Sequence, residues 1–176
     1  MRPVYCALLI LLPVCVAYPS VGVTVVLQFD DRYSELSIGE MKAEAQVLVK
    51  DSGVVLSWRR MDRLSSSDAF PRMVVVRLRG TCDVNMPVPP SAQESDSLGS
   101  TYILGGEPSP FSDIECDRIR SSLGAQPGPG ELAFGRALGR VLAHELHHVI
   151  ERTRQHTATG YRRKSLSVAD LVAKRR

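Results

Sequence analysis

The sequence has 176 residues, of which 44% are hydrophobic and 23% are charged. This length suits one globular domain with a hydrophobic core and is too short for two ordinary domains. The composition is close to the average of soluble globular proteins, which excludes a disordered chain, a fibrous chain and a multi-pass membrane protein. The formal net charge is +3, but residues 152–176 contain eight Lys or Arg and only Asp170 as an acid, so this segment alone carries +7.

The first 17 residues have the pattern of an export signal. Arg2 gives a short positive region, residues 4–12 are mostly apolar, and small residues end the segment at Ala17. The apolar run is shorter than the roughly 20 residues that a membrane-spanning helix needs. We therefore expect cleavage after Ala17, a secreted or periplasmic protein without a stable membrane anchor, and one mature domain over residues 18–176.

Removal of the leader changes the cysteine count. It takes away Cys6 and Cys15 and leaves Cys82 and Cys116. Two cysteines in an exported chain most simply form one disulfide, so we predict a bond between them. Two buried free thiols are the alternative if the chain keeps its first residues.

The first predicted elements are a strand and a helix. The β-branched apolar run at residues 21–29 is typical of a buried strand. Ser37 and Glu40 then have the spacing of a capping box, so we expect a helix to begin there. Its apolar residues follow helical spacing, and Gly53 can provide the left-handed residue that ends it.

Strands and loops alternate in the middle of the chain. Residues 54–58 and 73–78 are further predicted strands. Residues 83–99 are rich in Pro and Ser and predict a long surface loop. The short segment 100–104 has Gly on both sides, which is typical of a strand at the edge of a sheet.

A second capping-box spacing, formed by Ser112 and Glu115, predicts a short helix that carries Cys116. A Pro-Gly-Pro-Gly break at residues 127–130 precedes the longest helical pattern, residues 131–152. Apolar side chains share one face of this helix: Leu138, Leu142, Leu146, Val149 and Ile150. A ridge of small residues, Gly135, Gly139 and Ala143, would let the helix approach the sheet closely.

The same helix contains the His-Glu-x-x-His motif as His144, Glu145, Leu146, His147 and His148. At about 100° per residue, His144 and His148 lie about 40° apart on one face, so both imidazoles can bind one zinc ion. Three protein ligands leave a position for water, whose pKa the metal lowers. Glu145 would accept the proton of that water and pass it to the leaving amine. A surface helix with solvated histidines is the alternative interpretation.

The segment His144–His148, on a late helix after several strands, resembles the zincin metallopeptidases. Together with the tail at residues 156–171, it looks like a group of uncharacterised exported bacterial proteins of metallopeptidase type. The resemblance implies a zincin-like α/β (α+β) domain, in which a small mixed sheet with an edge strand packs on two main helices. It further implies zinc bound by His144 and His148, Glu145 as general base, and a peptide or protein substrate extended along residues 100–104.

The third zinc ligand departs from the known patterns. Metzincins have Gly and His three and six residues after the second histidine, where this chain has Glu151 and Arg154, and no Glu follows Glu151 as a gluzincin ligand. The remaining candidates are His156, Asp170 and Glu151. We choose His156, because imidazole matches the other two ligands; the chain must then leave the helix near residues 152–154 and fold back.

The other candidates have ordinary explanations. Asp170 lies near the start of a predicted tail helix, where a carboxylate is common. Glu151 is placed to orient His148 as a hydrogen-bond acceptor. His147 is expected on the flank of the helix, and Tyr161 either polarises a substrate carbonyl or is a surface residue of a basic loop.

Two classes of function remain open at this point. The first is an exported zinc peptidase that acts as a monomer. The second is a non-catalytic binding or structural protein in which a fourth protein ligand closes the zinc site. The basic tail is most simply a solvated end, although contact with an anionic surface is possible; no nucleic-acid motif accompanies it, so we expect no nucleic-acid partner.

Overall fold

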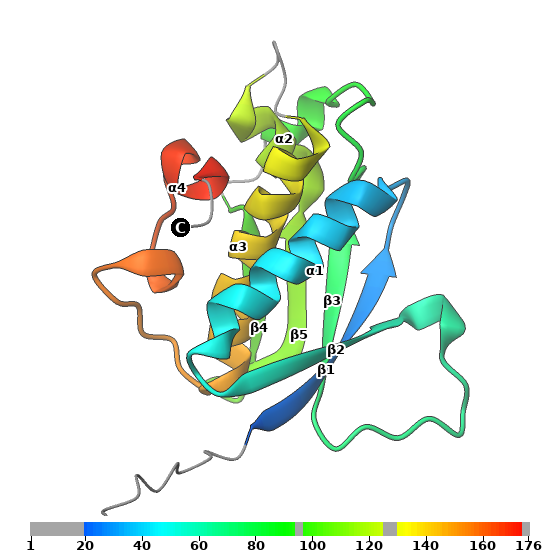
Figure 1. Cartoon of the computed structure of the whole chain (residues 1–176), viewed down its shortest axis with the longest axis vertical. Coiled ribbons are helices and arrows are strands. Elements are labelled where there is room, and N and C mark those ends of the chain that lie inside the picture. Colours follow the sequence, from blue (N-terminus) through cyan, green and yellow to red (C-terminus); the bar gives the residue numbers. More distant parts are fainter. Residues whose placement is uncertain (1–19, 94–96, 125–129, 174–176) are drawn as a thin grey trace, which may run out of the picture.

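The computed structural model of the chain describes residues 20–93, 97–124 and 130–173. The expected leader at residues 1–17 lies outside the described residues, and so does most of the expected break at residues 127–130. Within the described part, one sheet and the helices packed on it form a mixed α/β fold (Figure 1).

Five strands form one mixed sheet in the order β2-β1-β3-β5-β4. They are β1 (Val21–Phe29), β2 (Val54–Arg60), β3 (Met73–Arg79), β4 (Gly99–Leu104) and β5 (Glu107–Glu115). The first three and β5 run parallel, whereas β4 runs antiparallel to β5 and forms one edge of the sheet. The predicted strands and the edge position of residues 100–104 are confirmed.

Strand β5 corrects the expectation of a helix that begins at Ser112. Pro108 and Pro110 interrupt the strand pattern of this segment, since proline cannot donate to a sheet ladder. β3 pairs only with the second half of β5, so both prolines lie outside that pairing. Ser112 therefore lies within the strand, and helix α2 begins at Cys116 with Glu115 as its N-cap.

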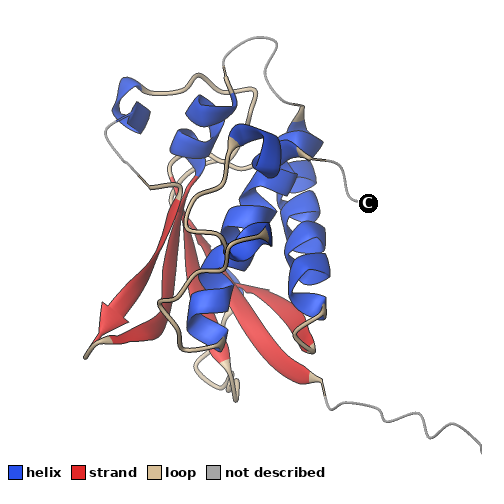
Figure 2. Cartoon of the chain, turned by 90° about the vertical axis from the view of Figure 1, so that its left-hand side faces the viewer, coloured by secondary structure: helices blue, strands red, loops and turns tan. Residues whose placement is uncertain are grey.

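Two long helices, α1 (Glu35–Lys50) and α3 (Glu131–Ile150), pack side by side on one face of the sheet (Figures 1 and 2). Two shorter helices are α2 (Cys116–Leu123) and α4 (Val168–Val172). The apolar core lies between the long helices and the sheet. Its fully buried members include Val25, Leu27, Val76, Leu78 and Ile114 from the strands and Ile38, Met41, Leu138, Leu142 and Leu146 from the helices.

Helix α1 begins earlier than its sequence indicates. Its N-cap is Ser34, whose side chain accepts a hydrogen bond from the N–H of Ser37. Ser37 is buried and donates its hydroxyl to the carbonyl of Glu131 in α3. The expected capping box of Ser37 and Glu40 is therefore wrong, because Ser37 joins the two helices. The end of the helix agrees with the prediction, since Gly53 has a φ of +70°.

The small residues of α3 face α1. A Cβ atom on Gly135 would lie 2.5 Å from the carbonyl oxygen of Ser37, and one on Gly139 would lie 2.6 Å from the Cβ atom of Glu44. Both distances are shorter than van der Waals contact, so only glycine permits this approach of the two helices. The small-residue ridge thus serves helix–helix packing, and the expectation that it faces the sheet is corrected.

Cys82 and Cys116 form a disulfide, and their Cα atoms are 5.1 Å apart. The predicted pairing is therefore present in the structure. Cys82 follows β3 and Cys116 begins α2, so the bond joins these two elements. The buried guanidinium of Arg120 donates to the carbonyls of Asp83 and Met86, which fixes the beginning of the long loop.

The connection between α3 and α4, residues 151–167, runs back along α3 and is called the strap below (Figure 2). It begins at Arg152, whose φ of 48° turns the chain out of the helix. The strap ends at α4, which Arg140 of α3 holds because its guanidinium donates to the carbonyls of Asp170 and Ala173. The expected departure near residues 152–154 is confirmed.

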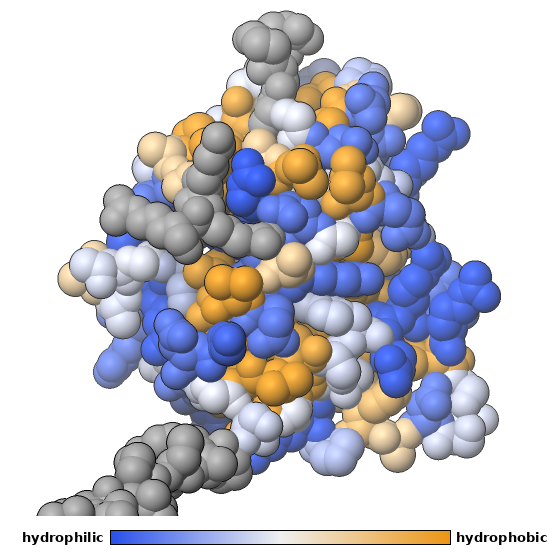
Figure 3. Space-filling view, viewed as in Figure 1, coloured by the Kyte–Doolittle hydropathy of each residue, from blue (hydrophilic) through white to orange (hydrophobic). Residues whose placement is uncertain are grey.

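Hydrophilic and hydrophobic residues are interspersed over the surface on the side of α1 (Figure 3). In the part of the chain that the structure describes, no helix is both long and apolar enough to span a membrane. Of the basic tail, residues 162–164 belong to the strap, whereas residues 174–176 lie outside the described part.

Candidate functional site

Three histidines meet where the strap passes the second half of α3. His144 and His148 come from the helix, and His156 comes from the strap. Their ligand-type nitrogen atoms all lie within 4.8 Å of one another, and this is the one such group of His, Cys, Asp or Glu among the described residues. The ring of His156 lies 5.1 Å from that of His144 and 4.9 Å from that of His148, centroid to centroid. The structure thus brings together the three histidines named from the sequence.

Backbone carbonyls of the strap orient both helical imidazoles. The Nδ1 atom of His144 lies 2.9 Å from the carbonyl oxygen of Tyr161, and the Nδ1 atom of His148 lies 2.8 Å from that of Thr153. Because a carbonyl can only accept, each Nδ1 carries the proton and donates it. In the neutral rings the lone pairs therefore lie on the Nε2 atoms.

These two Nε2 atoms face each other at a distance of 3.1 Å. Two lone pairs at this distance repel each other unless a cation, either a proton or a metal ion, lies between them. Burial lowers the pKa of His144, which disfavours the proton. The pKa of His156 is also lowered, by burial and by the nearby charges of the other two imidazoles and Lys164. The lowered pKa values favour the neutral forms of His144 and His156.

Glu145 lies beside the cluster and is only 4% exposed. Its Oε2 atom accepts a hydrogen bond of 2.7 Å from the hydroxyl of Thr101 in the edge strand β4. Burial raises the pKa of Glu145, while the bond from Thr101 and the charge of His148 act in the opposite direction. A carboxylate with a raised pKa is a better proton acceptor near neutral pH than an exposed one.

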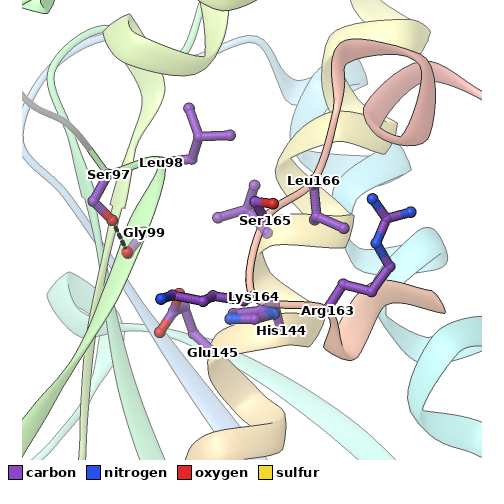
Figure 4. Close-up of a pocket in the computed structure, with 10 residues that line it drawn as sticks. Ser97, Leu98, Gly99, His144, Glu145, Arg163, Lys164, Ser165 and Leu166 are labelled. Atoms are coloured by element: carbon purple, nitrogen blue, oxygen red, sulfur yellow. Dashed lines mark hydrogen bonds between the residues drawn. The ribbon is translucent and has the colours of Figure 1, made fainter. Parts of the chain in front are cut away.

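A cleft with a volume of about 260 Å³ opens beside His144 and Glu145 (Figure 4). Residues 97–99, which lead into β4, line one side, and residues 163–166 of the strap line the other. The side chain of Lys164 extends across the cleft toward Glu145 (Figure 4). The motif glutamate and one histidine of the cluster are therefore reachable from this space.

Comparison with known proteins adds no family to this geometry. Neither a family model, nor a curated protein, nor a solved structure matches the chain. The chemistry of the described residues is therefore the basis for any functional assignment.

The two rival ligand candidates have other partners. Asp170 forms a capping box with Ser167 at the start of α4, which agrees with its expected role at a helix start. The carboxylate of Glu151 is paired with the guanidinium of Arg162 at 3.2 Å. The expectation that Glu151 orients His148 is wrong, because the carbonyl of Thr153 takes that position.

His147 lies outside the three-histidine cluster, as expected, and Tyr161 lies in the strap beside Arg162. His147 is buried, and burial together with the charge of Arg162 lowers its pKa. Its Nδ1 atom lies 3.9 Å from the carboxylate of Glu151, outside the three-histidine cluster. The hydroxyl of Tyr161 accepts a hydrogen bond from Arg162, so Tyr161 serves the site through its backbone carbonyl.

Sequence reasoning missed several groups of the site. Thr101 belongs to the predicted edge strand. Successive side chains of a strand point to opposite faces of the sheet, and this alternation is the signal that could have placed Thr101 on the face toward the helix. The carbonyls of Thr153 and Tyr161 have no sequence signal, because any residue supplies a carbonyl. Lys164 was noted as part of the basic tail, but only the folded strap places it at the cleft.

Proposed function

We propose that the chain is a zinc-dependent peptidase with a zincin-like domain, in which His144, His148 and His156 bind the metal and Glu145 is the general base. The observation that supports this most is the convergence of three imidazoles beside a buried glutamate at the rim of a cleft. The disulfide between Cys82 and Cys116 supports an oxidising compartment, as expected of an exported protein.

The donor set fits zinc. Two nitrogen atoms that bind one zinc ion tetrahedrally at the usual distances lie about 3.4 Å apart, and the Nε2 atoms of His144 and His148 are 3.1 Å apart. Both rings donate their other nitrogen to carbonyls, which is the usual arrangement around histidine ligands. When bound, zinc supplies Lewis acidity, which polarises a carbonyl group and lowers the pKa of water toward neutrality.

The remaining chemistry belongs to Glu145 and Thr101. The carboxylate of Glu145 accepts a proton from the attacking water and transfers it to the nitrogen of the leaving amine. The hydroxyl of Thr101 holds one carboxylate oxygen, which leaves the other free for the proton. Because Thr101 belongs to β4, its hydrogen bond fixes the position of the Glu145 carboxylate relative to the edge strand. An extended peptide along β4 would therefore lie next to the base.

A closed zinc site without catalysis is the less favoured function. Such a site needs a fourth protein ligand. Among the described residues, only the three histidines of the cluster come close enough together to bind one metal ion. Asp170 and Glu151, the other acids considered, are held by Ser167 and Arg162. The cleft beside His144 also supports a site that is open to a substrate.

The experiment compares the wild type with Glu145→Gln and His144→Ala. Metal content is measured by elemental analysis, and hydrolysis is measured on a broad peptide library. We expect one zinc per wild-type chain, loss of hydrolysis with retained zinc in Glu145→Gln, and loss of zinc in His144→Ala. Full activity of Glu145→Gln on a peptide that the wild type cleaves would contradict the proposed mechanism.

A further inference from the structure

We propose that the cleft beside the histidine cluster binds an acidic side chain of the substrate, and that Lys164 supplies the charge that selects it. This inference rests on the proposed function and names the substrate class for the same site. It follows from the charges around the cleft, from their partners and from the apolar residues that accompany them.

Three charged side chains line the cleft, namely Glu145, Arg163 and Lys164. The guanidinium of Arg163 lies 3.3 Å from a carboxylate oxygen of Asp170, so its charge is already compensated. Glu145 is held by Thr101 and acts in the proposed chemistry. Lys164 points toward Glu145 but forms no ion pair with it or with any other carboxylate among the residues that the structure describes, so its ammonium group is the available charge.

The shape of the cleft fits one side chain with an apolar stem and a polar end. Leu98, Val141 and Leu166 provide apolar contacts, and Ser165 adds a hydroxyl on the side of the strap. Figure 4 shows Lys164 lying across the cleft, between the strap and the start of β4. A volume of about 260 Å³ holds the methylene groups of glutamate with its carboxylate near Lys164.

Electrostatics disfavours the opposite choice. A basic substrate side chain would meet the ammonium group of Lys164, and a zinc ion at the cluster would add further positive charge. A neutral amide of the same shape would lose the ion pair and keep the apolar contacts. The order of preference at this position is therefore Glu above Gln, and Gln above Lys.

The test uses degenerate hexapeptide libraries in which one position at a time is fixed as Glu, Gln or Lys. Binding is measured on zinc-supplemented Glu145→Gln protein, which requires no hydrolysis, and cleavage is measured on the wild type. At one position we expect Glu over Gln by about fivefold, the size of one ion pair at a partly exposed site. Adding Lys164→Glu should reverse the order of preference, so that peptides with Lys bind best. Adding Lys164→Gln should make the preference for Glu over Gln disappear.

The matched control is Lys42→Glu, which makes the same charge change on α1 at a residue that does not line the cleft. It should leave the Glu-to-Gln ratio unchanged. An unchanged ratio in Lys164→Glu overturns the inference, and so does a wild type without acidic preference. If acidic peptides bind preferentially but no peptide is cleaved, the inference is supported and the peptidase proposal is contradicted. If peptides are cleaved without any acidic preference, the peptidase proposal is supported and the inference is contradicted. No binding and no cleavage contradict both.

Discussion

His156 is the residue whose role depends most on the folded strap. It lies within the three-histidine cluster, whereas Asp170 caps α4 and Glu151 pairs with Arg162. We expect His156→Ala to lower zinc affinity by more than the roughly 10–100-fold typical of groups that only orient a ligand. Asp170→Ala and Glu151→Ala should change it less than tenfold.

Zinc affinity of the three variants is measured side by side by competition with a chelator. Thermal denaturation without metal serves as the control, because it reports whether each variant still folds. Unchanged affinity in His156→Ala, with a large loss in either other variant, would transfer the ligand role to that acid.

Thr101 influences the proton affinity of Glu145. Burial raises the pKa of Glu145, and the hydrogen bond from Thr101 lowers it. Thr101→Val removes the hydroxyl and nearly keeps the shape, so the pKa of Glu145 should rise further. A general base acts when it is deprotonated, so the acid limb of kcat/KM should move to higher pH.

The measurement is the pH profile of peptide hydrolysis in the wild type and Thr101→Val. Ser112→Ala is the control, since Ser112 lies 3.0 Å from the Thr101 hydroxyl but does not bond Glu145. It should shift the acid limb less. A Thr101→Val profile that keeps its limb, or moves it to lower pH, would argue against a role of Thr101 in tuning the base.

At the scale of elements, Arg140 holds three helices together. Its Nε atom lies 2.8 Å from the carboxylate of Glu44 in α1, with side chains only 11% and 2% exposed. The same guanidinium donates to two carbonyls at α4. Arg140→Met removes the cation and leaves the Glu44 carboxylate buried, so we expect a loss of about 3 kcal/mol in the free energy of unfolding.

Urea denaturation measures this loss, and two comparisons interpret it. Arg136→Met removes the corresponding pair with Glu40, which is longer at 3.5 Å and more exposed, so its cost should be about 1 kcal/mol or less. The double variant Arg140→Met with Glu44→Met should be more stable than Arg140→Met alone. Equal costs for Arg136→Met and Arg140→Met would show that Arg140 has no special role.

Elements with strong periodic patterns were predictable. The three apolar strands and the long helix α3 appear where the sequence indicates them, because each contributes apolar side chains to the buried core. Local hydrogen-bond patterns were less reliable. Ser112 has the spacing of a capping box but pairs with β3 and β4 as part of a strand. Ser37 has the same spacing but donates its hydroxyl to α3. In both cases a tertiary interaction replaced the local one.

The candidate site could be predicted in part for a related reason. Two histidines and a glutamate on one helix are placed by helical geometry alone, so their spacing in sequence is enough. The path of the strap depends on Arg140 and on the packing of α4, which no local pattern encodes. The position of His156 was therefore a choice among candidates, and Thr101 and Lys164 were found only in the folded chain.

At the scale of the whole molecule, the disulfide between Cys82 and Cys116 closes a loop with a sequence separation of 34 residues. A loop of this length restricts the unfolded chain by about 4 kcal/mol in the entropic account. We expect replacement of both cysteines by alanine to lower the free energy of unfolding by a similar amount. Zinc affinity should not change, because no cysteine belongs to the histidine cluster.

Urea denaturation of the oxidised wild type and of the double variant gives the difference. The wild type under reducing conditions is the control, and it should behave like the double variant. Equal stability of oxidised and reduced wild type would mean that the bond does not constrain the unfolded chain.

The dependence of the cluster on the strap determines when the site can form during synthesis. A ribosome completes the His144–His148 segment before it adds Thr153, His156 and Tyr161, which provide the third imidazole and both orienting carbonyls. A nascent chain that ends before the strap has both motif histidines but lacks these groups. The proposed metal site is therefore complete only after the strap has been synthesised and has folded back onto α3.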